Sequence, residues 1–269
     1  MNKITQKMTQ IIFILLCLMI TNTAFGHNLW LNAIDFSPNF SKRTGAHTKI
    51  YFGFGHRFPV QDFLDKEKLT EFKLIKPDGQ SQDLEAGESG FLATPLIIKK
   101  EGAHIVTAGT KHGFYTMYMK NNRMHHKMGS KQGLENVVLS LYFENYTKAL
   151  INVGKTIDNA YSTPVGHGTE IVPLENPYLK KAGDTLKVKV LHNGRPASFC
   201  NVFATYVGFS STEDYAFTNK TNGKGITKIR LLHPGQWIVK AVIRKPATKE
   251  MSEKCIEMKY SATISFEVP

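Results

Sequence analysis

Short runs of alternating apolar and polar residues recur along the chain after its first 26 residues. Clear examples are residues 48–54 (TKIYFGF), 185–191 (TLKVKVL) and 237–243 (WIVKAVI). A period of two places the apolar side chains on one face, which is typical of a half-buried β-strand. Turn signals such as Pro77-Asp78-Gly79 and Asn193-Gly194 separate these runs. The pattern predicts an all-β protein built from antiparallel sandwiches.

Three segments depart from the alternation. Residues 120–133 (KNNRMHHKMGSKQG) are polar and predict an exposed loop. The apolar spacing over residues 135–153 is compatible with one amphipathic helix, and a pair of short strands is the alternative. Residues 158–168 (DNAYSTPVGHG) are rich in Gly, Pro and Ser and favour a domain boundary. We therefore expect two β-sandwich-like domains, an N-terminal one over residues 27–165 and a C-terminal one over residues 166–269.

The first 26 residues have the pattern of a secretory signal peptide. Two lysines precede an unbroken apolar run over residues 11–20, and small residues follow at Ala24 and Gly26. The pattern predicts cleavage after Gly26, a mature protein that starts at His27, and a periplasmic or secreted location. An uncleaved anchor is the alternative, although the run is shorter than the roughly 20 residues of a membrane span.

Composition excludes several classes of function. The formal net charge is +12, but the basic residues are scattered and no nucleic-acid-binding motif is present. No serine-hydrolase, zinc-protease, P-loop or dinucleotide-binding motif occurs either, so an enzyme is not the first expectation. After residue 26 no apolar run is long enough to span a membrane. Cys200 and Cys255 then favour one disulfide in an oxidising compartment, with a pair of reduced structural thiols as the alternative.

An N-terminal histidine is a natural metal chelator. The free α-amine and the ring Nδ1 of His27 can bind one ion in a six-membered chelate ring, and an amine pKa of about 7.7–8.0 lets a metal displace its proton. Further ligands are expected from His56, His104 or His112, and His47 is a less favoured candidate. The alternatives are an exposed loop position for His56, a buried core position for His104 and a turn position for His112.

A second group of candidate ligands lies at residues 124–128 (MHHKM). His125 and His126 offer imidazoles for Ni(II) or Cu(II), while the two flanking thioethers favour Cu(I). A solvated basic loop is the alternative. The remaining polar candidates are expected to serve structure or solvent contacts: His167, Glu170, His192 and His233.

Several segments resemble one bacterial family. Residues 168–196 (GTEIVPLENPYLKKAGDTLKVKVLHNGRP) resemble its signature, and residues 27–31 (HNLWL) resemble its mature start, His-x-x-Trp-Leu. Residues 53–58 (GFGHRF) and 234–241 (PGQWIVKA) resemble its glycine–histidine segment and its late strand. The family is the periplasmic nickel-uptake substrate-specific family, long of unknown function and also described as an additional periplasmic component of nickel ECF transporters.

This resemblance implies a two-part β protein whose second part is similar to carboxypeptidase-regulatory or transthyretin-like sandwiches. It also implies a soluble protein that binds nickel or cobalt beside a membrane metal transporter, with His27 and, less specifically, His56 as ligands. One alternative is a copper-binding protein or copper oxidase with an N-terminal histidine brace. That brace needs a second His in T-shaped geometry and usually an aromatic or other axial group, for which His104 or His112 with a Tyr such as Tyr115 are candidates. The other alternative is a metal-free module that binds proteins or glycans.

Overall fold

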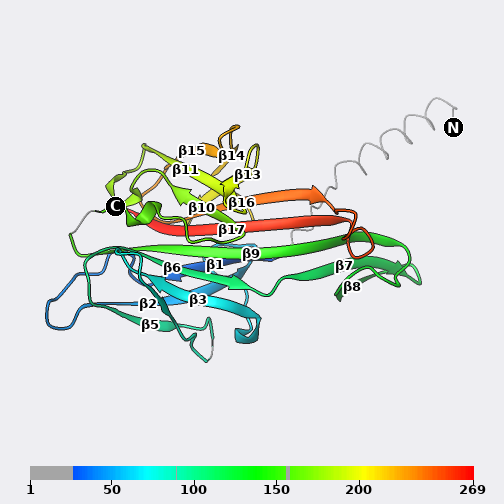
Figure 1. Ribbon diagram of the computed structural model, residues 1–269, viewed down its shortest axis with the longest axis horizontal. Coiled ribbons are helices and arrows are strands. Elements are labelled where there is room, and N and C mark those ends of the chain that lie inside the picture. Colours follow the sequence, from blue (N-terminus) through cyan, green and yellow to red (C-terminus); the bar gives the residue numbers. More distant parts are fainter. Residues whose placement is uncertain (1–26, 89, 156–157) are drawn as a thin grey trace, which may run out of the picture.

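The computed structural model describes residues 27–88, 90–155 and 158–269, and they form an almost entirely β structure (Figure 1). The predicted all-β, sandwich-like class is therefore confirmed. The predicted signal peptide, residues 1–26, lies outside the described residues. Within the described part of the chain, no helix is long and apolar enough to cross a membrane.

The strands form three sheets. The largest has ten strands in the order β14-β13-β16-β17-β9-β6-β3-β4, with β7 and β8 continuing beside β9. Its strands are β3 (Leu69–Ile75), β4 (Ser81–Asp83), β6 (Gly102–Thr110), β7 (Gly113–Lys120), β8 (Arg123–Met128), β9 (Val137–Val153), β13 (Asn201–Tyr206), β14 (Phe217–Lys220), β16 (Gly235–Pro246) and β17 (Glu257–Val268). A three-stranded sheet contains β1 (Asn28–Ala33), β2 (Ala46–Gly55) and β5 (Thr94–Ile98). A four-stranded sheet contains β10 (Thr169–Pro173), β11 (Thr185–His192), β12 (Arg195–Pro196) and β15 (Ile226–Arg230). Short 3-10 helices are η1 (Lys66–Lys68), η2 (Ala160–Ser162) and η3 (Pro177–Leu179).

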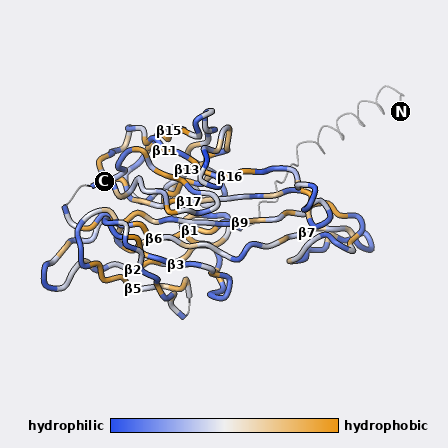
Figure 2. Tube along the Cα trace, in the orientation of Figure 1, coloured by the Kyte–Doolittle hydropathy of each residue, from blue (hydrophilic) through white to orange (hydrophobic). Residues whose placement is uncertain are grey.

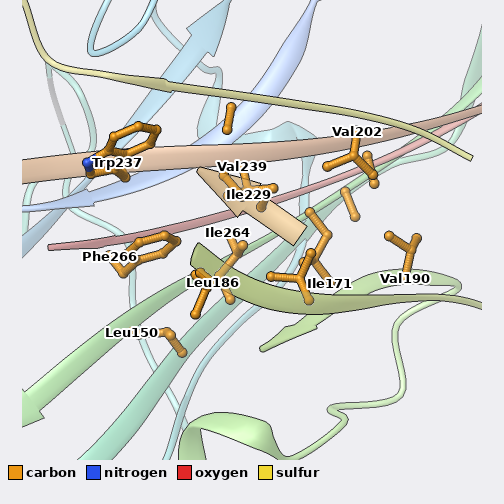
Figure 3. Close-up of a cluster of buried hydrophobic side chains, with 14 of the residues drawn as sticks. Leu150, Ile171, Leu186, Val190, Val202, Ile229, Trp237, Val239, Ile264 and Phe266 are labelled. Carbon is orange, nitrogen blue, oxygen red and sulfur yellow. The ribbon is translucent and has the colours of Figure 1, made fainter. Parts of the chain in front are cut away.

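The large sheet is buried on both faces where β6 and β9 pair. Ile105 and Leu150 belong to a core shared with β10, β11 and β15. Figure 3 shows Leu150 in this cluster together with Trp237 and Phe266. The neighbouring strand positions Val106 and Ile151 are counted in a second core shared with β1, β2 and β5. β6 is accordingly buried at all nine positions, and hydrophobic stretches gather on the strands in the middle of the molecule while its outer loops are hydrophilic (Figure 2).

One sheet contains strands from both predicted domains. β17 pairs in parallel with β9 from Glu257–Leu141 to Ser265–Ala149. The boundary between residues 165 and 166 stays a prediction, and the structure adds that main-chain hydrogen bonds connect the two sides. The segment at this boundary is held by a buried ion pair, in which Lys148 Nζ lies 2.6 Å from Glu170 Oε2.

The helix expected over residues 135–153 is wrong, because this segment forms the 17-residue strand β9. Along one edge β9 pairs first with β7 and then with β6, and along the other edge it pairs with β17. Its β-branched and aromatic residues suit this two-sided pairing. Long-range pairing partners, which periodicity does not report, decide between helix and strand here.

The loop expected over residues 120–133 is also partly wrong. Arg123–Met128 form β8, which pairs with β7 in a hairpin. Asn121 and Asn122 form its turn with φ angles of 51° and 56°. Asparagine tolerates this left-handed conformation, and a two-residue turn of this kind matches the twist of the flanking strands. The Asn-Asn dipeptide was the signal for a hairpin.

The expected disulfide is wrong, because Cys200 and Cys255 are both buried free thiols. Cys200 Sγ lies 3.5 Å from the carbonyl oxygen of Val242, and Cys255 Sγ lies 3.6 Å from that of Met251. Each thiol therefore has its own backbone carbonyl oxygen as a hydrogen-bond acceptor. The pair of reduced structural thiols, which was the alternative, describes both residues.

We expect both thiols to be unreactive in the folded protein. Burial raises the pKa of Cys200 to about 12 and raises the pKa of Cys255, so neither forms the reactive thiolate at neutral pH. Thiol titration without reductant should detect no thiol in the native protein and two after denaturation. Detection of none after denaturation would show that a disulfide forms.

Candidate metal site at the N-terminal histidines

The pairing of β1 with β2 places His27 beside His56. Asn28 lies opposite Gly55, so the next pair outward in this antiparallel register joins residue 27 to residue 56. The two imidazole centroids are 5.0 Å apart and the ring planes meet at 80°. Phe54, the diagonal neighbour on β2, packs edge-on against His27 at 4.8 Å. The strand register therefore builds a perpendicular pair of imidazoles at the end of β1.

A tryptophan–glycine pair locks the same two strands together. Trp30 lies opposite Gly53, and a Cβ on Gly53 would fall 1.9 Å from the indole Nε1. The indole Nε1 donates to the carbonyl oxygen of Pro59 at 2.7 Å, and Asn32 Nδ2 donates to the same oxygen at 2.9 Å. These contacts fix the loop that follows His56, and they give a structural reason for the Trp and Gly in the two N-terminal segments.

Gly53→Ala is expected to displace the indole and to shift β1 against β2. Overpacking of a filled site costs about 1–3 kcal/mol, so chemical denaturation should show a loss of this size, together with weaker metal binding. Gly223→Ala is the matched control, because a Cβ at Gly223 meets no atom within 4 Å. Equal stability of the two variants would contradict the packing argument.

A glutamine side chain positions the backbone of His56. Gln61 Oε1 accepts from the amide N of His56 at 2.5 Å and from that of Arg57 at 2.9 Å. Gly55 has a φ of +130°, and a Cβ there would lie 2.7 Å from the same Oε1. The glycine before His56 is therefore needed both for its backbone conformation and for space.

Hydroxyl groups of the large sheet hold β1 on its other side. Thr263 Oγ1 donates to the carbonyl oxygen of Leu29 at 2.7 Å, and the amide N of Leu31 donates to Thr147 Oγ1 at 3.1 Å. Ser265 Oγ donates to the carbonyl oxygen of Leu31. The position of His27 is thus set against both the three-stranded sheet and the large sheet.

His27 and His56 border a cavity of about 670 Å³ over the large sheet. Leu141 and Phe143 of β9 line it together with Lys259 of β17. Carboxylates face the histidines from loops: Asp62 lines the cavity, and Glu213 Oε2 lies 3.9 Å from His56 Nδ1. The remaining lining residues are Phe54, Phe63, Asp65, Lys68, Tyr115, Met128 and Asn145.

Partial removal from water keeps both histidines in the form that binds metals, with His56 half-buried and His27 the more exposed of the two. Removal from water is the main cause that lowers the pKa of both His27 and His56, against the opposing carboxylates Asp62 and Glu213. Burial also lowers the pKa of Lys259 to about 7. At neutral pH both rings are therefore neutral, which is the state required of an imidazole ligand.

The residues present fit a three-nitrogen metal site. Among the described residues, no group of three or more His, Cys, Asp or Glu side chains is placed to hold a metal ion. Two imidazoles alone bind weakly, but the α-amine of a chain that starts at His27 adds a third nitrogen. Nitrogen donors of this kind suit Ni(II), Cu(II) and Zn(II).

His104 and His47 do not join this site. His104 is buried on β6 opposite Ile151, far along β9 from Leu141, and its Nδ1 lies 3.1 Å from the carbonyl oxygen of Gly102. The expected core position of His104 thus agrees with the structure. His47 is exposed on β2.

His112 belongs to a separate hydrogen-bonded cluster. Its Nε2 lies 3.0 Å from Tyr146 Oη and its Nδ1 lies 3.2 Å from Tyr142 Oη. Tyr142 Oη donates to Glu144 Oε1 at 2.9 Å. Burial is the main cause that raises the pKa of Tyr146 to about 12, so the phenol keeps its proton. Both ring nitrogens of His112 are engaged by tyrosines rather than aimed at His27.

The two histidines of β8 point to opposite faces, as neighbours on a strand do. His125 stacks on Tyr118 with ring centroids 5.5 Å apart, whereas His126 Nδ1 is hydrogen-bonded to Tyr115 Oη. They cannot act together as a pair. Tyr115 and Met128, on the face of His126, line the cavity of the N-terminal histidines.

Polar candidates assigned to structure have protein partners. Glu170 bonds Lys148, and His167 Nε2 lies 2.8 Å from Glu71 Oε1. His192 Nδ1 lies 3.0 Å from Thr169 Oγ1. Sequence reasoning missed Asp62 and Lys259 as neighbours of His27. The one available signal for a buried cation was the position of Lys259 within the apolar-rich segment that forms β17.

Comparison with known proteins gives the family but no activity. The sequence profile of a family described as a domain of unknown function (DUF4198) matches residues 24–245. No curated protein matches the chain. Among solved structures, the D00-D0 domain of Intimin is similar at 15% identity and a TM-score of 0.20, over 90% of this chain and 99% of that one.

Proposed function

The chain belongs to the DUF4198 family, whose function is unknown, and we propose that this member binds one divalent transition-metal ion outside the cytoplasm. The observation that carries the proposal is the perpendicular pair of His27 and His56 at the end of β1. In the mature chain the amine and ring of His27 chelate the ion, and His56 supplies the second ring. The resemblance to the nickel-uptake family makes Ni(II) or Co(II) the first candidate for the bound ion. The protein would pass this ion on to a membrane transporter.

The surroundings of the two rings support metal binding. The ligands are neutral, so the bound ion keeps its charge, which the nearby carboxylates of Asp62 and Glu213 partly balance. The adjoining cavity leaves room for a water molecule or for a ligand of a receiving protein, which a protein that passes on an ion requires.

Copper is the second candidate, and the second imidazole beside His27 is the observation that favours it. An N-terminal amine with two imidazoles is the donor set of a copper histidine brace. Cu(II) should also bind most tightly of the divalent ions in vitro, because affinities for nitrogen sites peak at copper. Turnover of a reductant by the copper-loaded protein would favour an oxidase over a carrier.

The experiment that tests the proposal is calorimetric titration of metal-stripped protein whose intact mass begins at His27. Ni(II), Co(II), Cu(II) and Zn(II) should each fill one site, and His56→Ala should weaken each by roughly tenfold or more. The exposed His47→Ala serves as the matched control and should bind like the wild type. Binding of no metal, or equal binding by His56→Ala, would overturn the proposal.

Lys259→Met is expected to strengthen metal binding at mildly acidic pH. The pKa of Lys259 is lowered to about 7, so its ammonium charge is present mainly below pH 7, where it repels the ion. Removing the charge should raise the affinity by roughly threefold to tenfold there and have little effect well above pH 7. Titrations at two pH values check this, with the exposed Lys228→Met as control. A loss of affinity would instead identify Lys259 as a ligand.

A further inference from the structure

We propose that one face of the β7–β8 hairpin is a separate Cu(I) site made of methionine sulfurs. The hairpin register pairs Met119 with Met124 and Met117 with His126. Cross-strand partners point to the same side, and so do residues two apart along one strand. Tyr115 and Met128 form the next pair on this side. Four thioethers and one imidazole therefore share what we call the methionine face.

The placement of these methionines is concentrated. The chain has nine methionines, three of them before residue 26, and four of the remaining six lie on this face within residues 117–128. Burial does not explain the two on β8, because Met128 is 70% exposed and Met124 is 43% exposed, while Met117 and Met119 on β7 are half-buried. The β7–β8 hairpin lies at one end of the molecule, beside the start of β9 (Figure 1).

The opposite face of the hairpin has a different character. It carries Lys120, Arg123 and Lys127, together with Thr116, Tyr118 and His125, and these residues alternate with those of the methionine face. Near its turn the hairpin is thus an exposed, cationic ribbon with methionines on one side. Soft thioether sulfur selects Cu(I), whereas Ni(II) and Co(II) prefer imidazole and harder donors. The donor chemistry of the face is therefore specific for the reduced copper ion.

His126 is held ready as the nitrogen ligand of this set. The hydrogen bond between its Nδ1 and Tyr115 Oη leaves Nε2 for a metal and orients the ring, as second-shell partners of ligating histidines do. Tyr115 and Met128 also line the cavity of His27 and His56. The methionine face thus runs from the hairpin turn to the N-terminal histidines, and Cu(I) captured on it would be released beside them.

The test uses the full mature chain under anaerobic conditions, with Cu(I) supplied from a coloured chelator that competes for it. The variant carries leucine at all four positions, Met117→Leu, Met119→Leu, Met124→Leu and Met128→Leu, because leucine keeps the apolar volume. It should lose Cu(I) affinity by roughly tenfold or more. A second variant, Met117→Leu with Met119→Leu and Met124→Leu, keeps the cavity-lining Met128, and it should lose Cu(I) affinity while its Ni(II) titration is unchanged. The matched control replaces Met251 and Met258 by Leu and should behave like the wild type.

The methionine site does not rest on the proposed function, and the failure of one can be distinguished from the failure of the other. A chain with four extra residues (Gly-Ser-Gly-Ser) before His27 should lose Ni(II) binding and still take up Cu(I) with sulfur scattering in its X-ray absorption spectrum. Cu(I) affinity that survives all four leucines would overturn the inference. So would Cu(I) affinity lost on blocking His27 alone, since the N-terminal histidines would then hold the ion.

Discussion

A chain with four extra residues (Gly-Ser-Gly-Ser) before His27, which take the free amine away from the ring, is expected to lose most of its affinity for Ni(II) and Cu(II). The added peptide bond removes the free amine and with it the chelate ring, while His27 and His56 keep their places at the end of β1. Linked donors gain affinity because the second one binds at a high effective concentration, so the loss should be roughly a hundredfold or more. Competition titration against a chelator of known affinity measures it.

The control for this prediction is the stability of the extended chain. The pairs that hold β1, such as Trp30 opposite Gly53, do not involve the amine, so thermal unfolding of metal-free protein should be unchanged. Addition of metal should stabilise only the chain that starts at His27, since a ligand of the native state shifts unfolding by mass action. Equal stabilisation of both chains would contradict the amine chelate.

Glu170→Gln is expected to destabilise the protein by about 3–5 kcal/mol, because it leaves the buried ammonium of Lys148 without its counter-charge. Both side chains are only 2% exposed, and Nζ lies 2.6 Å from Oε2. Glu170 also accepts from the amide N of Val165 at 2.9 Å and from that of Gly166 at 3.2 Å. Loss of these contacts frees the segment before β10. Urea denaturation of the metal-free protein measures the change in the free energy of unfolding.

The matched control is an exposed ion pair. Lys66 Nζ also lies 2.6 Å from a carboxylate, that of Glu88, but at the surface, so Glu88→Gln should change stability by less than about 1 kcal/mol. A replacement of both buried partners, Lys148→Met with Glu170→Leu, should recover much of the loss. Equal effects of Glu170→Gln and Glu88→Gln would show that burial of the pair does not matter.

The same pair predicts the direction of the acid dependence. The Lys148 ammonium and two backbone amides hold the pKa of Glu170 below its usual value, against the cost of burial. A carboxylate with a lowered folded pKa contributes stability above its unfolded pKa of about 4.3, and this contribution is lost as the pH falls through the folded pKa. Glu170→Gln should therefore lose less stability than the wild type on acidification below about pH 4.

The fold class could be predicted from sequence because alternation reports one-sided burial directly. TLKVKVL became β11 with Leu186, Val188 and Val190 buried and Lys187 pointing out. The prediction failed at β9, whose two faces are both buried, so no simple alternation remained over residues 137–153. It failed at β8 because a polar hairpin is held by pairing with β7 rather than by burial. The error at β9 thus concerns partners distant in sequence, whereas the error at β8 concerns a local hairpin turn.

The site was predictable in part for a physical reason. Position after the signal pattern pointed to His27, and a glycine-flanked histidine pointed to His56, which the β1–β2 register brings together. The other candidate ligands lie away from this pair: His104 lies in the core and His112 lies among tyrosines. Asp62 and Lys259 were missed because each reaches the site from another element. Only the register and the sheet layering reveal such neighbours.

The most direct measurement is the nitrogen hyperfine spectrum of the Cu(II)-loaded mature protein, with and without nitrogen-15 histidine. The spectrum should show one amine and two imidazole nitrogens bound to a single ion, and one imidazole should be lost in His56→Ala. A spectrum unchanged by His56→Ala, or imidazole signals that vanish instead in His125→Ala or His126→Ala, would contradict the claim that His27 and His56 form the metal site.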